Sequence, residues 1–191
     1  MTLRKIAHIG HPVLRERARE VTREELASQA MQQLVDDLIE TMRDANGAGL
    51  AAIQVYEPVR IVVMEVQGNP RYPYKPKIPL TVLVNPVLTP VGEETFSNYE
   101  GCLSVPNLRG RVSRWARLHV RAWDRAGQDI DATIAGITAG TYQHEVDHLD
   151  GRMFVDRVTD TGSLTTWEGF ERYHQARFID EVRAIVETYG S

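Results

Sequence analysis

The segment QHEVDHLDG, residues 143–151, constrains this chain more than any other part of the sequence. It places His144 and His148 four residues apart, with Glu145 between them. On a helix, such residues lie one turn apart on the same face, so both imidazoles can bind one divalent cation while Glu145 lies beside a water. The motif arises by chance in about one chain in a hundred of this composition. The rest of the sequence must therefore decide between a catalytic metal, a structural metal and no metal.

Two histidines do not complete a metal site, so a third ligand is required. The downstream acids Asp150, Asp156 and Glu168 do not have the spacing that metzincins use. Upstream, the single cysteine, Cys102, lies in the segment EGCLSVP (100–106). A lone buried cysteine is most often a small apolar residue. A thiolate with two imidazoles, however, would leave a fourth position open for water, whereas structural sites are closed by four protein ligands. This pattern favours a catalytic centre.

The spacing of apolar residues predicts an α+β fold. Helices are expected over residues 23–45, 132–149 and 163–189. Val-rich or alternating segments predict strands over residues 60–66, 81–88 and 117–123. We expect mixed or antiparallel β-sheets packed around a central helix that carries H-E-x-x-H, plus a C-terminal helix, in a single catalytic domain over residues 1–191.

Three local features refine this prediction. Thr22 and Glu25 have the spacing of a capping box at the start of the first helix. Gly136 and Gly140 fall within the predicted helix 132–149, where each costs about 1 kcal/mol relative to alanine, so a close buried contact is the expected compensation. Residues 67–80 carry proline at every third position from Pro70 to Pro79, which favours a polyproline-like loop. This loop is either a stiff solvent-exposed connection, a lid beside a cleft, or a docking segment for an aromatic groove.

Composition narrows the class of protein. The net charge of −4 argues against a nucleic-acid-binding protein, which usually carries a basic excess. There is no apolar run long enough to span a membrane and no secretory signal at the start of the chain. A single cysteine excludes an intramolecular disulfide and fits a reducing compartment. We therefore expect a cytoplasmic protein that does not enter membranes and does not recognise nucleic acid directly.

A third segment, GAGLAAIQV (47–55), precedes EGCLSVP and QHEVDHLDG. These three segments, in this order, resemble the signature motifs of the peptide deformylase family, and the resemblance covers nearly the whole chain. Ile53 stands before the glutamine where Pro or Thr is commoner, and we expect this to alter packing but not chemistry. The resemblance implies an enzyme that removes the formyl group from the N-formyl-methionine of newly made polypeptides. Formate would be released by attack of a metal-bound hydroxide.

The resemblance also implies the ligands of the metal and the residue that moves protons. Cys102, His144 and His148 would bind one divalent ion, and Glu145 would be the general acid–base. The ion expected in the cell is Fe(II), with Zn, Ni or Co as alternatives in the isolated protein, because the ligands alone do not define the metal.

Further residues take their expected roles from the same resemblance. The Gln54 amide and the Leu103 backbone N–H would face the oxygen of the reacting carbonyl, although a solvent-facing or loop-bracing amide without a catalytic role is the alternative for Gln54. Gly47 and Gly49 would let the backbone approach the substrate closely, and Arg109 would lie near the substrate-binding cleft.

The helix that carries H-E-x-x-H also offers candidate residues for the pocket that binds the methionine side chain. Ile137 and Thr141 precede His144 by one or two turns on the same face and are candidates to line it, although plain core packing explains Ile137 equally well. The peptide is expected to bind as an added strand, because main-chain hydrogen bonds tolerate any following sequence.

Two other functions remain to be weighed. One is a zinc peptidase or amidase that uses the same helix, against which Cys102 and the Gln54 motif argue. The other is a non-enzymatic metal-binding or ribosome-docking protein, against which the presence of both Glu145 and Gln54 argues. An enzyme that acts on nascent chains can contact the ribosome transiently. The last predicted helix nevertheless mixes acidic and basic residues and does not form a basic docking surface.

Overall fold

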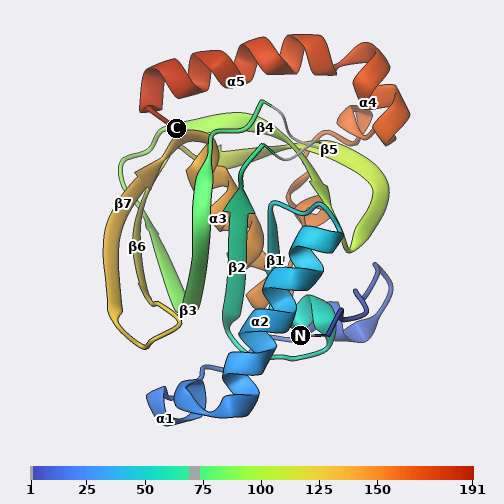
Figure 1. The fold of residues 1–191 in the computed structure, drawn as a ribbon. Helices are drawn as coiled ribbons and strands as arrows, with labels where there is room; N and C mark the ends of the chain where they lie inside the picture. Colours follow the sequence, from blue (N-terminus) through green and yellow to red (C-terminus); the bar gives the residue numbers. More distant parts are fainter. Residues whose placement is uncertain (1, 69–73) are drawn as a thin grey trace.

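The computed structural model describes residues 2–68 and 74–191 (Figure 1). A five-stranded antiparallel sheet has the spatial order β1 (Gly49–Ala51), β2 (Ile61–Val66), β3 (Ile78–Pro90), β6 (Arg117–Trp123) and β7 (Asp129–Ala135). A separate hairpin pairs β4 (Thr95–Cys102) with β5 (Val105–Trp115). The helices are α1 (Arg23–Ala27), α2 (Gln29–Asp44), α3 (Gly136–Leu149), α4 (Trp167–Tyr173) and α5 (Gln175–Tyr189). This arrangement confirms the predicted α+β fold with antiparallel sheets and a C-terminal helix.

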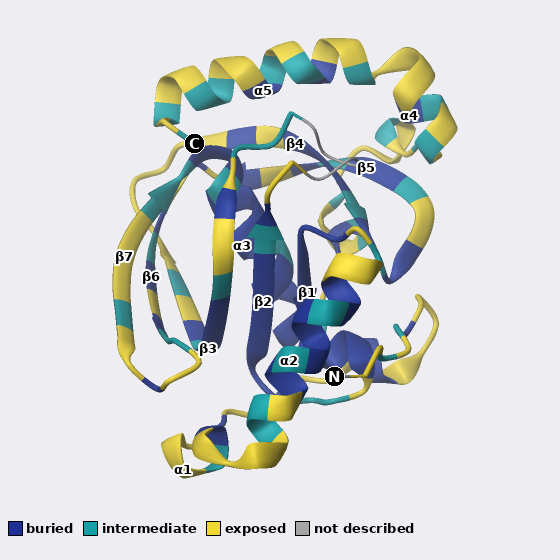
Figure 2. Ribbon diagram, in the orientation of Figure 1, coloured by how far each residue is buried: buried dark blue, intermediate teal, exposed yellow. Residues whose placement is uncertain are grey.

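The five-stranded sheet is covered on both faces, which explains the continuous apolar run in β2. Ile61 and Val63 belong to the apolar cluster of α2, whereas Val62 and Met64 belong to the cluster that contains residues of α3. All four side chains are fully buried, and Figure 2 shows β2 buried along almost its whole length. Successive side chains of a strand point to opposite faces, so an apolar run of this kind fits a strand between two layers. The face of the sheet that carries Val62 and Met64 therefore packs against α3.

The hairpin holds the other side of α3. Along β4, the alternate residues Phe96, Asn98, Glu100 and Cys102 are all buried, and three of them contact α3 directly. A Cβ atom at Gly140 would lie 3.1 Å from Cζ of the Phe96 ring. The helix thus approaches the strand closely at Gly140, which is the compensating contact that the sequence predicted there.

The C-terminal helices cover the hairpin and the start of α3 (Figure 1). They do so through an apolar cluster that draws on β4, α3, α4 and α5 and comprises Phe96, Tyr99, Ala116, Ile137, Phe170, Phe178 and Val182. None of the described helices combines the length and the apolar character that crossing a bilayer requires.

The predicted helix boundaries were wrong in three places. The helix expected over 23–45 breaks at Ser28, whose hydroxyl caps the start of α2, although the predicted Thr22–Glu25 capping box is present. The helix expected over 163–189 is divided at His174 into α4 and α5. The helix expected over 132–149 starts only at Gly136, which has a φ of 59°. Residues before it form β7, because apolar residues four apart satisfy both a helical period and strand alternation.

The strand predictions held where the sequence is rich in valine. β3 contains the expected segment 81–88, β6 has the expected bounds, and β2 starts one residue later than expected, at Ile61. β1, β4 and β5 were not predicted, and β4 and β5 carry the EGCLSVP segment. The proline-rich loop expected over 67–80 falls partly outside the described residues, including Pro70 and Pro73, and its last three residues belong to β3.

Candidate active site

Three potential metal ligands meet between the hairpin and α3. Cys102 ends β4, and His144 and His148 lie one turn apart on α3. One ligand atom from each residue lies within 4.8 Å of the others, and Cys102 Sγ is 3.2 Å from His148 Nε2. Cys102 and His148 are almost completely buried. Within residues 2–68 and 74–191, this is the one cluster of Cys, His or acidic residues with such geometry.

The donor set fits a divalent transition metal. Burial disfavours the charge on Cys102, but the positive charge of His148 and hydrogen bonds from both imidazoles outweigh it and hold the pKa of the thiol well below its usual value. A bound metal would displace the imidazole protons, and a thiolate with two neutral imidazoles is a ligand set that binds zinc, iron and neighbouring metals. Three protein ligands leave a coordination position for water or substrate.

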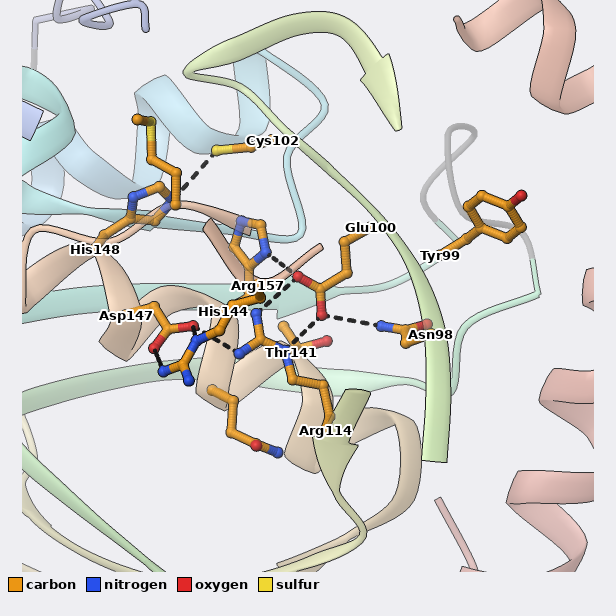
Figure 3. Close-up of polar contacts among 12 residues, drawn as sticks. Asn98, Tyr99, Glu100, Cys102, Arg114, Thr141, His144, Asp147, His148 and Arg157 are labelled. Atoms are coloured by element: carbon orange, nitrogen blue, oxygen red, sulfur yellow. Dashed lines mark hydrogen bonds and ion pairs between the residues drawn. The ribbon is translucent and has the colours of Figure 1, made fainter. Parts of the chain in front are cut away.

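A buried ion-pair network orients His144 (Figure 3). Its Nδ1 atom lies 2.7 Å from Glu100 Oε2, which leaves Nε2 for the metal. Arg114 donates two hydrogen bonds to Glu100, of 2.8 and 2.9 Å, and a third of 2.6 Å to Asp147. Arg157 completes the network with two hydrogen bonds to Asp147. The positive charge of Arg114 outweighs burial, so that the pKa of the Glu100 carboxyl lies well below its usual value.

Sequence reasoning missed this network. Glu100 and Asp147 stand inside two of the quoted motifs, but nothing in their spacing indicates an arginine between them. The one available signal was the presence of acids next to candidate ligands, since metal-binding histidines usually donate their second N–H to a carboxylate or carbonyl.

Glu145 faces the same space as the three ligands. It is buried, and its Oε2 atom accepts no hydrogen bond from the described residues. Burial raises the pKa of its carboxyl, although the charges of His144 and His148 oppose the shift. A Cβ atom added to Gly49 would lie 2.4 Å from Glu145 Oε1. Gly49 therefore makes room for this carboxylate, which is a more specific role than the close substrate approach expected from the sequence.

Gln54 lies in the short 3₁₀ helix Ala52–Val55 and is directed at the cluster. Its Oε1 atom accepts a 2.8 Å hydrogen bond from the Ala51 backbone N–H. Its Nε2 atom donates to Ser104 Oγ at 3.0 Å and lies 3.6 Å from Cys102 Sγ. The side chain thus braces its own loop, as the non-catalytic alternative expected. It also places its Nε2 donor beside the candidate ligand Cys102. Ile53 before it is fully buried in the core.

One small cavity connects these groups, and its volume of about 30 Å³ is enough for about two water molecules. Every residue that the sequence assigned to the site lines this cavity except His148 and Ile137. His148 lies beside Cys102, with its Nε2 atom 3.2 Å from Cys102 Sγ. Ile137 packs in the apolar cluster under the C-terminal helices, so the structure places it in the core and away from the cavity.

Arg109 lines the cavity, and its side chain is fixed by ring contacts and hydrogen bonds to several elements of the fold. It is fully buried, with its guanidinium 4.0 Å from the Phe170 ring and 4.5 Å from the Trp167 ring. It donates hydrogen bonds to the Tyr99 carbonyl at 3.1 Å and to the Tyr74 hydroxyl at 3.2 Å. Arg109 therefore ties α4, the hairpin and the segment before β3 together at one wall of the cavity.

Fold and site together define a class of protein: hydrolases that carry H-E-x-x-H on a central helix and complete the ligand set from another element. Comparison with known proteins identifies the family within this class. Residues 3–163 match the family model described as polypeptide deformylase. Peptide deformylase 1 of Prochlorococcus marinus is 44% identical over 165 residues, covering 86% of this chain and 85% of the relative. Peptide deformylase 1 of Nitrosomonas europaea is 40% identical, covering 83% and 89%.

Comparison with solved structures identifies the same family. A class I type b peptide deformylase from Acinetobacter baumannii, solved with Met-Ala-Ser bound, superposes with a TM-score of 0.79 at 38% identity and covers 82% of this chain and 99% of its own. A peptide deformylase from Synechococcus elongatus in complex with actinonin gives a TM-score of 0.73 at 27% identity, covering 98% and 86%. The chain belongs to the peptide deformylase family and is a hydrolase of that kind, as the three motifs predicted.

Proposed function

We propose that this enzyme removes the formyl group from the N-terminal formyl-methionine of newly synthesised polypeptides and releases formate. The observation that carries the proposal is the convergence of Cys102, His144 and His148 beside Glu145 in one cavity. The Acinetobacter relative was solved with Met-Ala-Ser bound, a peptide equivalent to a deformylated N-terminus, which supports the same substrate class here. Residues 1–191 would act as one catalytic domain.

The metal would be held by Cys102 Sγ and by Nε2 of His144 and His148. When bound, a divalent ion lowers the pKa of a water molecule and so supplies a nucleophile near neutral pH. We assign Fe(II) as the ion in the cell. The same donors hold zinc more tightly than iron, so Zn, Ni or Co can replace iron during isolation.

Glu145 would move the proton. Its carboxylate is buried, and burial raises its pKa toward the range that suits a general base. It would accept the proton of the attacking water and then deliver it to the nitrogen of the departing amine. One carboxylate can serve both steps because the water and the amine nitrogen occupy neighbouring positions on the same carbon.

Gln54 and Leu103 would stabilise the negative charge that develops on the formyl oxygen. The Oε1 atom of Gln54 is engaged by Ala51, which turns its Nε2 donor toward Cys102. Leu103 follows Cys102 and lines the cavity, so its backbone N–H is the second donor that we assign. Preorganised donors of this kind each contribute about 10²–10³-fold to turnover.

The peptide would bind along β1. This strand lies at the end of the described five-stranded sheet, so an extended peptide can add to its edge by main-chain hydrogen bonds. Gly47 and Gly49 line the cavity at this point, and Thr141 lies across it on α3. Arg109 closes the cavity wall behind the substrate.

The cellular setting follows from this chemistry. Newly made polypeptides are the substrates, so we place the enzyme in the cytoplasm with transient contact to the ribosome. A reducing compartment also keeps the Cys102 thiol available as a ligand.

The direct test offers formyl-Met-Ala and Met-Ala-Ser to anaerobically purified enzyme and measures formate and free amino acids. We expect formate from the first peptide, no cleavage of the second, and loss of formate release after metal chelation with recovery on adding Fe(II). Release of methionine from Met-Ala-Ser would instead identify an aminopeptidase.

Gly49→Ala should impair catalysis without removing the metal. The added Cβ atom would lie 2.4 Å from Glu145 Oε1, so the carboxylate must move. A misplacement of about 1 Å costs on the order of 10²-fold in rate, and we expect kcat/KM to fall by that factor at unchanged metal content. Gly101→Ala is the matched control in the same cavity, because its nearest neighbours would lie 3.4 Å away. Equal activity of the two variants would refute this role of Gly49.

A further inference from the structure

The segment just before β3 reaches into the active-site cavity. Tyr74 is held from two sides: its ring packs edge-on against Phe178 of α5 at 5.4 Å, and its hydroxyl accepts a hydrogen bond from Arg109. The next residue, Lys75, lines the cavity. Two residues further on, Lys77 is exposed. Part of the proline-rich stretch thus serves to fix a lysine inside the site.

Lys75 is attached to the helix that carries the H-E-x-x-H motif. Its Nζ atom donates a 3.3 Å hydrogen bond to Thr141 Oγ1. Thr141 precedes His144 and Glu145 by three and four residues, so it lies one helical turn, about 5 Å along the axis, from these two residues. Thr141 is also a residue expected to line the pocket for the substrate's first side chain, so its partner Lys75 lies at the same part of the cavity.

The same part of the cavity holds a buried oxygen that needs a donor. Asn98, on β4 opposite Thr141, is 2% exposed and lines the cavity. Its Nδ2 atom donates to Glu100 Oε1 at 3.3 Å, but its Oδ1 atom accepts no hydrogen bond from the described residues. Figure 3 shows Asn98 and Thr141 next to the pair formed by Glu100 and His144. Buried polar atoms are almost always hydrogen-bonded, so Asn98 makes this wall of the cavity polar, and its oxygen needs a donor that the described residues do not supply.

We propose that Lys75 is a specificity-determining residue whose ammonium donates a hydrogen bond to the heteroatom of the substrate's first side chain. The proposal rests on the proposed deformylase function and names the substrate class more closely. The cavity would favour formyl-peptides whose first side chain carries an acceptor at the position of the methionine sulfur. The thioether of methionine is a weak acceptor, the sulfoxide oxygen of oxidised methionine is a strong one, and norleucine has none.

The experiment compares three peptides of nearly equal shape: formyl-norleucine-Ala, formyl-Met-Ala and formyl-methionine-sulfoxide-Ala. We expect kcat/KM to rise in that order, with the sulfoxide peptide at least about tenfold above norleucine, because a site that hydrogen-bonds its substrate discriminates strongly against an analogue that lacks the group. Lys75→Met should reduce this ratio tenfold or more, by lowering turnover of the sulfoxide peptide more than turnover of the norleucine peptide. Lys75→Arg should restore most of the ratio.

Lys77→Met is the matched control, because it removes an exposed lysine from the same segment. A ratio in Lys75→Met equal to that of the wild type, or a wild-type preference for norleucine over the sulfoxide, would overturn the proposal. Calorimetric binding of the unformylated peptides to the metal-loaded enzyme gives a second readout. Absence of formate from all three peptides would refute the proposed function, whereas the binding series would still test Lys75.

The proposal also has a pH signature. Burial lowers the pKa of Lys75 to about 8, with Glu100 and Glu145 opposing the shift and Arg109 adding to it. The ammonium is therefore present below about pH 8 and is lost above it. The sulfoxide-to-norleucine ratio should fall as the pH rises through this value, and it should stay flat in Lys75→Met.

Discussion

Glu145→Ala lowers the rate of formate release by about 10²–10⁴-fold, the usual contribution of a general acid–base group, while the enzyme keeps its metal. The reason is that Glu145 lies in the cavity beside the ligands but is not one of the three clustered donors. Steady-state kinetics with formyl-Met-Ala and metal analysis of the same preparation measure the two effects separately.

Glu187→Ala is the control, since this acid is exposed on α5 far from the chemistry, and it should retain wild-type turnover. If Glu145→Ala kept turnover within a few-fold of the wild type, another group would have to move the proton. If it lost the metal instead, Glu145 would belong to the ligand set and the open coordination position would be in doubt.

Arg114→Leu should destabilise the protein more than any other single change considered so far. Arg114 is 3% exposed and bridges Glu100 and Asp147, so its removal leaves the buried Glu100 carboxylate without its main partner and takes away one of the two arginines that bind Asp147. Breaking a buried pair by deleting one partner costs about 3–5 kcal/mol. We expect a loss of this size in the free energy of unfolding, measured by urea denaturation of the metal-free protein at pH 7.

The same variant should weaken metal binding. Glu100 orients His144 through its Nδ1 atom, and disturbing such an outer partner lowers metal affinity by about 10–100-fold. Arg177→Leu is the matched control, because Arg177 is largely exposed and forms only a surface pair with Glu181. It should change stability by less than about 0.5 kcal/mol. Equal stability of the two variants would show that the network does not support the site.

The sequence singled out the three candidate ligands that the structure brings together because their signals are local. The spacing of His144 and His148 defines one helix face, and the segment around Cys102 supplies the third donor. The strands β2, β3 and β6 were predictable for a related reason: valine-rich or alternating residues report burial on one or two faces.

The remaining features depend on contacts between distant segments. Arg114 meets Glu100 and Asp147 across 14 and 33 residues, and no local pattern encodes such a pairing. Lys75 donates a hydrogen bond to Thr141, which lies 66 residues further along the chain. Nothing in the proline-rich sequence around Lys75 indicates this contact or the position of Lys75 in the cavity. Residues 132–135, the last four of β7, were assigned to a helix because their apolar pattern fits both periods, and only pairing with β6 decides between them.

X-ray absorption spectroscopy of the anaerobically purified enzyme, combined with metal analysis, tests the central claim most directly. With zinc loaded into the site, the account predicts one ion per chain, one sulfur at about 2.3 Å, two imidazole nitrogens at about 2.0–2.1 Å and one exchangeable oxygen. A spectrum without sulfur would remove Cys102 from the ligand set. A fourth protein ligand in place of the exchangeable oxygen would mark a closed structural site and contradict the proposed catalysis.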